Sequence, residues 1–316
     1  MCPHCQSRNT LKKGTPHGVQ RYECRDCTML FQNERRRSDE PIKELWRQYV
    51  FGKQTMREMG RDKRTIRKLF GTYTAPTKVH QPRPVHLVAD ATYFGERLED
   101  SSWCVAVLRD PRAKEDLVWQ FAPTETTSLY VGLKEELLKQ GYIVRSVTAD
   151  GFSGIPSAFQ GIPYQMCHVH MERLVTRGTT RKPQTEAGVV LLALVRTLHT
   201  TDSRTFTTRL EAYVAKYRDF LNEKTTNPFT GEKYWTHKEL RGAVMSLIRY
   251  RPYLFTFEQN KKIPRTTNSI EGHFSHINEI IAVHRGLSRP QKQKVLNTIL
   301  LASTIAPTKR KLSHIL

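Results

Sequence analysis

The order of apolar segments between residues 86 and 150 limits the possible folds more than any other feature of the sequence. Three strand-like segments, 86–94, 103–110 and 115–122, are followed by a helical pattern over 127–141 and a fourth strand-like segment over 142–150. The short links between the first three strands predict an antiparallel meander. The helical crossover predicts that the fourth strand runs parallel to one of them. The sequence therefore predicts an α/β (α+β) fold around a mixed sheet.

The rest of the chain is expected to be mainly helical. A short helix over 151–161 and a fifth strand over 162–169 precede a helical stretch of about 172–262. Helices are predicted over 186–199, 204–222, 238–250, 269–283 and 289–303. In the helix over 127–141, the residues expected on one buried face are Leu129, Leu133, Leu137 and Leu138, with Gly141 as the C-terminal cap.

Two aspartates stand at unusual places in the predicted sheet. Asp90 lies in the middle of the first strand between Ala89 and Ala91, where a carboxylate is costly unless it binds something. Asp150 ends the fourth strand. If this strand lies beside and parallel to the first, the two carboxylates repel each other and raise each other's pKa unless a cation holds them. The expected cation is Mg²⁺ or Mn²⁺, because hard ions prefer carboxylate oxygens.

Glu271 is the candidate third carboxylate. The apolar stripe of the helix over 269–283 consists of Ile270, Phe274, Ile277 and Ile281. Glu271 lies about 100° around the helix from Ile270, at the edge of the stripe, where it is expected to face the strand ends. The alternative interpretation is structural, because Asn268 and Glu271 have the spacing of a capping box.

Four cysteines at the N-terminus have the spacing of a zinc site. Cys2 and Cys5 form one CxxC pair, and Cys24 and Cys27 form another after 18 intervening residues. Two such pairs supply four thiolates to one tetrahedral zinc ion, whose binding would stabilise a segment too small to fold alone. Unrelated buried thiols are the alternative.

The sequence from 41 to 70 predicts two helices joined by a turn. The residues expected on their inward faces are Leu45, Tyr49, Met56, Met59, Ile66 and Leu69. Gly60 permits the turn, and Asp62 is a natural N-cap for the second helix. The second helix exposes Lys63, Arg64, Arg67 and Lys68, as a DNA recognition helix does. A solvated basic helix in an αα-hairpin is the alternative.

Charge points to a polyanionic partner. The 316 residues carry a formal net charge of +21, and residues 1–86 contain 19 basic and 8 acidic side chains. Nucleic acid is the usual partner of so basic a protein. No secretory or membrane-spanning segment is recognisable. A reducing, cytoplasmic location is therefore expected, in which cysteines bind metals or stay as thiols.

Several stretches resemble bacterial insertion-sequence DDE transposases, nearest the Mutator-like group. These are "VADATYFG" around Asp90, "VTADGFSG" around Asp150 and "TTNSIEGHFSHIN" around Glu271. A Cys-x2-His pair after the second aspartate, Cys167 and His170, is also shared. The close of the N-terminal segment resembles the zinc ribbon of such transposases through Tyr22, Cys24, Cys27 and Phe31.

The resemblance implies a multidomain organisation. It implies a zinc ribbon over 1–33, a helix-turn-helix domain over 34–72, a linker over 73–84 and a ribonuclease-H-like catalytic domain over 85–316. The stretch of about 172–262 would be a helical insertion in that domain. The residues expected to support the metal site without binding the metal are Cys167, His170 and Asn268. For the cysteine–histidine pair, packing or support of the metal site is favoured, and a metal site of their own is the alternative.

The implied function is DNA transposition. Asp90, Asp150 and Glu271 would hold two Mg²⁺ or Mn²⁺ ions for DNA strand cleavage and strand transfer, and one structural Zn²⁺ would sit in the ribbon. The N-terminal modules would bind the terminal inverted repeats in double-stranded DNA, and the basic surface would hold target DNA. The synapsis of two ends implies at least a homodimer, and the site of action would be the bacterial nucleoid.

Two other functions compete with transposition. A transposase-derived DNA-binding protein without enzymatic activity would keep the first 70 residues and would tolerate loss of the acids, yet all three acids are present. A ribonuclease-H-like structure-specific nuclease or resolvase would cut branched DNA without strand transfer.

Overall fold

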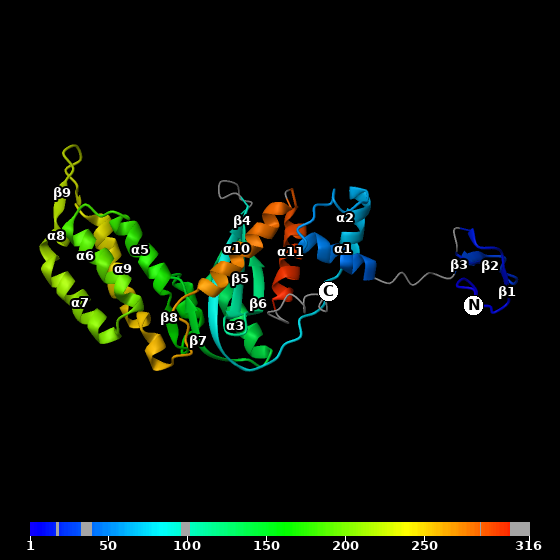
Figure 1. The fold of residues 1–316 in the computed structure, drawn as a ribbon, viewed down its shortest axis with the longest axis horizontal. Coiled ribbons are helices and arrows are strands. Elements are labelled where there is room, and N and C mark those ends of the chain that lie inside the picture. Colours follow the sequence, from blue (N-terminus) through cyan, green and yellow to red (C-terminus); the bar gives the residue numbers. More distant parts are fainter. Residues whose placement is uncertain (17–18, 33–39, 96–101, 285, 304–316) are drawn as a thin grey trace. The chain divides into compact units, whose positions relative to one another are not determined.

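The chain divides into two compact units, Met1–Tyr73 and Thr74–Leu316. The computed structural model describes residues 1–16, 19–32, 40–95, 102–284 and 286–303 (Figure 1). The expected boundary between zinc ribbon and helix-turn-helix, at 33/34, lies outside the described residues, as does the end of the chain from 304. Among the described residues, no helix is long and apolar enough to cross a membrane.

The first part of unit 1 is a small antiparallel sheet. It contains β1 (Thr10–Lys12), β2 (Arg21–Cys24) and β3 (Leu30–Gln32) in sequence order. Tyr22 on β2 pairs with Phe31 on β3, and their rings stack with centroids 5.6 Å apart. These two rings pack on the small sheet, in a segment that has few buried apolar side chains.

Two helices follow, α1 (Glu40–Val50) and α2 (Lys63–Thr72). Gly60 has a φ of +64°, which a glycine adopts freely, and the Asp62 carboxylate accepts a hydrogen bond from the Thr65 amide at 3.0 Å. Both predictions for this turn are therefore confirmed.

The core between α1 and α2 is more aromatic than expected. The Trp46 ring lies 4.9 Å from that of Phe70 and 5.0 Å from that of Tyr73. Of the side chains expected to face inward, Tyr49 and Ile66 are buried. The other four are only half-buried: Leu45, Met56, Met59 and Leu69. These four side chains are thus only partly covered, and the buried centre of the pair of helices is formed mainly by aromatic side chains.

Unit 2 is built on a five-stranded mixed sheet. Its strand order is β6-β5-β4-β7-β8. The strands are β4 (Pro84–Phe94), β5 (Trp103–Asp110), β6 (Glu115–Ala122), β7 (Ile143–Ala149) and β8 (Tyr164–Met166). The first three pair antiparallel, and β7 pairs parallel with β4. The predicted meander and the predicted parallel pairing of the fourth strand are both confirmed, and the structure shows that its partner is the first strand, β4.

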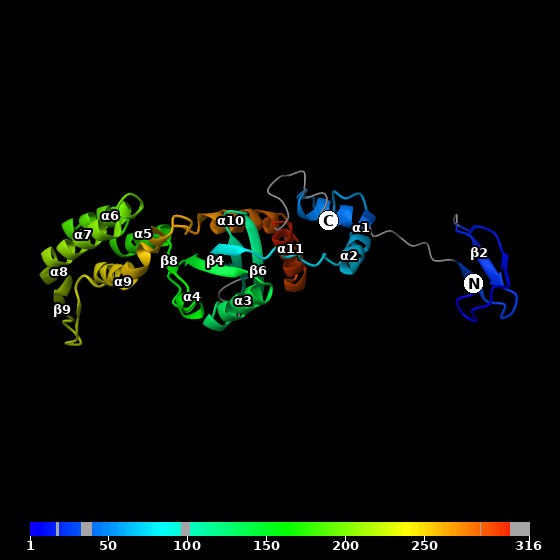
Figure 2. The ribbon, with the colours of Figure 1, turned by 90° about the horizontal axis from the view of Figure 1, so that it is seen from below.

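Helices cover both faces of this sheet. Figure 2 shows α3 (Thr127–Lys139) below the sheet and α10 (Asn268–Val283) above it, and α11 (Arg289–Ala302) also packs on β6. Leu129, Leu133 and Leu137 of α3 are buried, whereas Leu138 is 46% exposed, so its placement on the buried face was wrong. The whole apolar stripe of α10, expected from the sequence, is buried.

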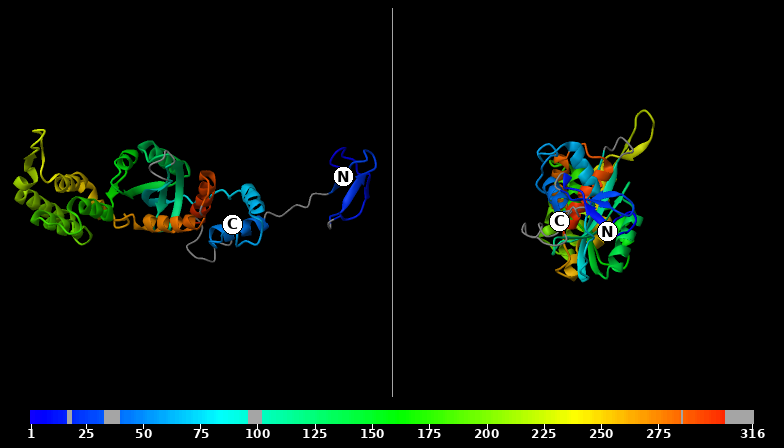
Figure 3. Two further views of the ribbon diagram at one scale, coloured as in Figure 1. Left: turned by 90° about the horizontal axis from the view of Figure 1, so that it is seen from above. Right: turned by 90° about the vertical axis from the view of Figure 1, so that its right-hand side faces the viewer.

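A group of helices inserted after β8 extends from the edge of the sheet (Figures 1 and 3). It consists of α5 (His168–Thr179), α6 (Glu186–Arg196), α7 (Ser203–Lys216), α8 (Arg218–Asn222) and α9 (Lys238–Leu254). The short helix α4 (Gly154–Ala158) lies between β7 and β8. The expected helical stretch thus begins at 168 rather than 172.

Two elements of the insertion were not expected. Helix α5 contains histidines and β-branched residues, which favour helices weakly. For this reason the predicted strand over 162–169 includes the first two residues of α5. The loop after α8 forms a hairpin of β9 (Lys224–Thr226) and β10 (Lys233–Trp235). The α5–α9 contact depends on Gly178, since a Cβ there would lie 2.7 Å from the Glu239 carbonyl oxygen.

Candidate functional site

The sheet register places Asp90 and Asp150 side by side. Val88 on β4 pairs with Thr148 on β7 in parallel register, and each aspartate follows its paired residue by two positions. Side chains alternate along a strand, so Asp90 shares a face with Val88 and Asp150 shares one with Thr148. Ala89 and Ala149, which directly precede the two aspartates, point to the other face and belong to the core under α3. The aspartates therefore point to the face that α10 covers.

The electrostatics of Asp90 show the proximity of the second carboxylate. Burial raises the pKa of Asp90 to about 7, and the charge of Asp150 adds to the rise. A hydrogen bond from the Ala91 amide and the charge of His170 act in the opposite direction. A half-buried carboxylate whose ionisation is disfavoured by burial and by a second carboxylate beside it forms a site that a cation would stabilise.

Glu271 lies in the first turn of α10, beside α5. Its carboxylate accepts a hydrogen bond from Arg173 Nη1 at 2.8 Å and one from Thr267 Oγ1 at 3.1 Å. His170 Nδ1 lies 3.7 Å from Glu271 Oε1. Since His170 also acts on Asp90, it connects the pair of aspartates with the third acid.

The capping-box interpretation of Asn268 and Glu271 was wrong. The N-cap of α10 is Thr267, one residue before Asn268, and no capping box forms there. The Asn268 side chain is exposed and makes no hydrogen bond within the described ranges of the chain. Glu271 is therefore free of a capping role, and its carboxylate is held by Arg173 and Thr267 instead.

Cys167 and His170 form a compact group with Glu271. The three ligand atoms lie within 4.8 Å of one another. Thr267 connects them, because its hydroxyl lies 3.3 Å from both Cys167 Sγ and His170 Nδ1. Burial opposes ionisation of Cys167, but hydrogen bonds from His170 and Thr267 lower the pKa of this thiol below its usual value. This packed group fixes the first turn of α5 against the first turn of α10.

A fourth acid, Glu125, belongs to the same region and was missed in the sequence. Burial raises its pKa and the charge of Asp150 raises it further, whereas a 2.5 Å hydrogen bond from the buried Tyr130 hydroxyl lowers it. Glu125 also acts on Asp90. In the sequence it is an ordinary turn glutamate before a helix, and only the sheet brings that turn to the aspartates.

A buried polar group anchors α10 to the sheet. Asp116 on β6 is fully buried and pairs with Arg109 on β5. His273 Nε2 on α10 lies 2.7 Å from Asp116 Oδ2, and the Ser303 hydroxyl donates to the same oxygen at 2.5 Å. Because His273 and Glu271 belong to the same helix, this anchor also determines where Glu271 lies.

The comparison with protein families decides the identity of this unit. A model described as the IS66 family of transposases matches residues 86–275, more than half of the chain. The chain belongs to this transposase family. No curated protein sequence matches the chain.

The matched range contains all three predicted carboxylates as well as Cys167 and His170. Membership of this DDE transposase family implies DNA as the substrate and the use of divalent metal ions. The matched range leaves out the N-terminal 85 residues of the transposase.

The four N-terminal cysteines of the transposase form one cluster. Their sulfur atoms all lie within 4.8 Å of one another. Cys2 Sγ lies 3.7 Å from Cys27 Sγ, and Cys5 Sγ lies 3.4 Å from Cys24 Sγ. The two CxxC pairs therefore face one point, with the donor set of a tetrahedral zinc site.

The predicted DNA-contacting side chains of α2 are accessible. All four are exposed: Lys63, Arg64, Arg67 and Lys68. The buried Ile66 and Phe70 form the packing side of the helix, next to the basic side chains. The helix thus presents one basic face and packs with the other.

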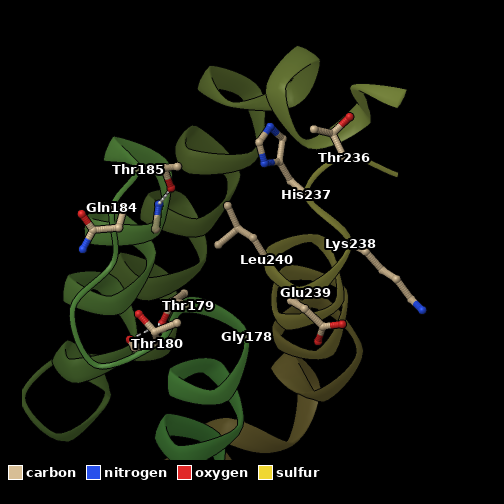
Figure 4. Close-up of a pocket in the computed structure, with 11 residues that line it drawn as sticks. Gly178, Thr179, Thr180, Gln184, Thr185, Thr236, His237, Lys238, Glu239 and Leu240 are labelled. Atoms are coloured by element: carbon tan, nitrogen blue, oxygen red, sulfur yellow. Dashed lines mark hydrogen bonds between the residues drawn. The ribbon is translucent and has the colours of Figure 1, made fainter. Parts of the chain in front are cut away.

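The helical insertion contains a hollow of about 340 Å³ between α5 and α9 (Figure 4). Gly178, Thr179 and Thr180 line it from α5 and its end, and Leu240 points into it from α9. Figure 4 shows Lys238 pointing away from this space. Its lining is mainly hydroxyl, amide and apolar groups, which lack the paired carboxylates of a metal centre.

Proposed function

We propose that this transposase cuts DNA and transfers the freed strand at a site formed by Asp90, Asp150 and Glu271. The proposal includes a ribonuclease-H-like core in unit 2. The observation that carries it is the side-by-side placement of Asp90 and Asp150 on parallel neighbouring strands, with the pKa of Asp90 raised to about 7. Two acidic side chains close together on the sheet, one of them with a raised pKa, are expected where a cation binds.

The donor set fits Mg²⁺ or Mn²⁺. Carboxylate oxygens are hard ligands, and Asp90, Asp150 and Glu271 would hold the ions, with Glu125 close enough to act on the two aspartates. When bound, a pair of such ions activates water and stabilises the leaving 3′ oxygen of DNA.

The protein's own groups prepare this site. Tyr130 orients Glu125, Thr267 and His170 orient Glu271, and the Ala91 amide donates to Asp90. Arg173 is exposed at the rim and balances the charge of Glu271. Glu125, Glu271 and Asp90 therefore each have a partner that limits the rotation of the carboxylate before DNA arrives.

Unit 1 would supply DNA recognition. The cysteine cluster would hold one structural Zn²⁺. The basic face of α2 would contact the DNA of the terminal inverted repeats. The family match identifies a transposase family. The closer relation to Mutator-like transposases remains a prediction. At least a dimer would join the two ends, acting on nucleoid DNA in the cytoplasm.

The test is cleavage of a DNA fragment that carries the inverted repeats flanking the reading frame. Asp150→Asn should remove Mg²⁺-dependent cleavage and leave end binding unchanged, while Asp219→Asn on the exposed surface of α8 should cleave like wild type. Undiminished cleavage by Asp150→Asn would remove this residue from the site. Cutting of branched DNA without strand transfer by wild type would favour a resolvase.

A further inference from the structure

A groove of about 990 Å³ runs along α5 away from the carboxylates. His170 and Arg173, which line its start, are the residues that contact Glu271. The groove then passes Thr176 and Arg177 and continues beyond the end of α5 to Thr180 and Arg181. It is therefore continuous with the candidate site, although its walls belong to the helical insertion.

Arginines dominate the charge of this groove. Arg173, Arg177, Arg181 and Arg196 are all exposed. The acidic side chain on the wall is Glu172, which lies 3.5 Å from Arg196 Nε. Within the ranges that the structure describes, neither Arg177 nor Arg181 pairs with a carboxylate. Two long cations that line one groove thus have no internal carboxylate partner in the described parts of the chain.

The spacing along α5 matches a polyanion. Arg173 and Arg177 are one helical turn apart on the same face, and a helix rises about 1.5 Å per residue, which separates them by about 6 Å. The phosphates of one DNA strand recur about every 3.4 Å along the axis. Guanidinium groups about 6 Å apart therefore match phosphates roughly two positions apart along the axis of one strand. Guanidinium forks bind phosphate oxygens well.

We infer that this arginine groove binds the sugar–phosphate backbone of the donor DNA that flanks the bond being cut. The inference rests on the proposed function, since it takes Glu271 as part of the cleavage site. Arg173 would stand nearest the reacting phosphate, and Arg177 and Arg181 would hold the strand beyond it. The hollow between α5 and α9 adjoins the groove, because Thr180 lines both.

The inference separates two DNA contacts of the transposase. Unit 1 would read the inverted repeat, whereas the groove would position the backbone next to the cleavage point and carry no sequence information. Loss of the groove should therefore alter protection of the flank and cleavage, but not recognition of the repeat.

The experiment compares hydroxyl-radical footprints of the full chain on the fragment that carries the element's end and its flank. Arg177→Ala with Arg181→Ala should lose protection of the flanking phosphates, keep protection inside the repeat, and cut at least about tenfold more slowly at moderate salt. The matched control is Arg204→Ala with Arg209→Ala on α7, which removes the same charge and should resemble wild type. Arg177→Gln with Arg181→Gln, of similar side-chain length, repeats the test if the alanine variant folds poorly.

The outcomes distinguish this inference from the proposed function. If wild type cuts the DNA and the groove variants keep both flank protection and rate, the inference is wrong while the proposed function stands. An equal loss in the α7 control would also overturn it, because charge alone would explain the effect. Defective strand transfer with intact flank protection would assign the groove to target DNA and contradict the donor assignment. Failure of wild type to cut would instead contradict the proposed function.

Discussion

The two candidate metal sites of this transposase are assembled in opposite ways. The cysteine cluster of unit 1 comes from one short segment, residues 2–27, whose paired CxxC spacing already brings the thiols together. The carboxylates of unit 2 come from β4, the end of β7 and α10, and 181 positions separate Asp90 from Glu271. A closed thiolate site stabilises a fold, whereas partly exposed hard oxygen ligands leave room for a substrate. On the proposed function, the first site would hold a structural metal and the second a reactive one.

The largest expected effect is that of zinc removal on unit 1. A zinc-selective chelator, or Cys24→Ser, should unfold residues 1–32, because structural zinc contributes roughly 10–16 kcal/mol of apparent free energy in small domains. Hydrogen exchange should show rapid exchange in β1–β3 and unchanged protection in β4–β7. Protection of β1–β3 that survives chelation would mean that the cysteines do not hold the segment by a metal.

Asp90→Asn should affect unit 2 in two opposite directions. Cleavage should fall by more than the roughly 10–100-fold typical of residues around a metal's ligands. The free energy of unfolding of the metal-free protein should rise, because the folded pKa of Asp90, about 7, lies above its unfolded value of 3.8. Between pH 3.8 and about 7 the Asp90 carboxyl is ionised in the unfolded chain but still protonated in the folded protein. The free energy of unfolding of wild type therefore falls as the pH rises through this range, by an amount on the order of a few kcal/mol at pH 8.

The measurement is the melting temperature without metal at pH 5 and pH 8. The gain of Asp90→Asn over wild type should be larger at pH 8, and added Mg²⁺ should stabilise wild type but not the variant. An equal gain at both pH values would show that Asp90 does not titrate in this range.

Glu125→Gln tests whether the fourth acid supports the hard-ion site. The variant should need a roughly tenfold higher Mg²⁺ concentration for cleavage, a change in the range seen for residues that orient metal ligands. The control is Glu135→Gln on the exposed face of α3, which removes the same charge. An Mg²⁺ titration separates the two variants, and identical curves would remove Glu125 from the site.

The smallest expected effect concerns the basic face of α2. Arg64→Ala with Arg67→Ala should weaken end binding and reduce the salt slope by about 1.8, since each lost phosphate contact reduces it by about 0.9. The rate of cleavage at saturating protein should not change. The Arg204→Ala, Arg209→Ala pair is again the control, and an unchanged slope would show that α2 does not face DNA.

The sequence was sufficient wherever short-range patterns decide structure. Helix α3 was predicted from its leucines, the turn before α2 from Gly60 and Asp62, and the parallel return of β7 from the length of its crossover. Leu138 was misplaced because a helical pattern leaves the edge of the buried stripe undefined, and neighbouring elements decide which side is covered.

Long-range contacts explain what the sequence analysis missed. Glu125 reaches the aspartates because the β6–α3 turn lies at the same end of the sheet, and its burial depends on Tyr130. Helix α5 has weak local propensity, and packing against α9 at Gly178 stabilises it. The apparent capping role of Asn268 failed because the preceding residue, Thr267, is fixed by Cys167 and His170 from a distant segment.

The sequence by itself determined the two cysteine pairs, the basic face of α2 and the antiparallel meander, and it indicated the three candidate acids. Only the tertiary structure decided which groups surround those acids: Glu125, His170, Arg173 and the arginine groove along α5. The physical reason is range. Spacing and amphipathic periodicity act within a few residues, whereas the pKa of Asp90 and the pairing of Glu271 depend on charges that the fold alone brings together.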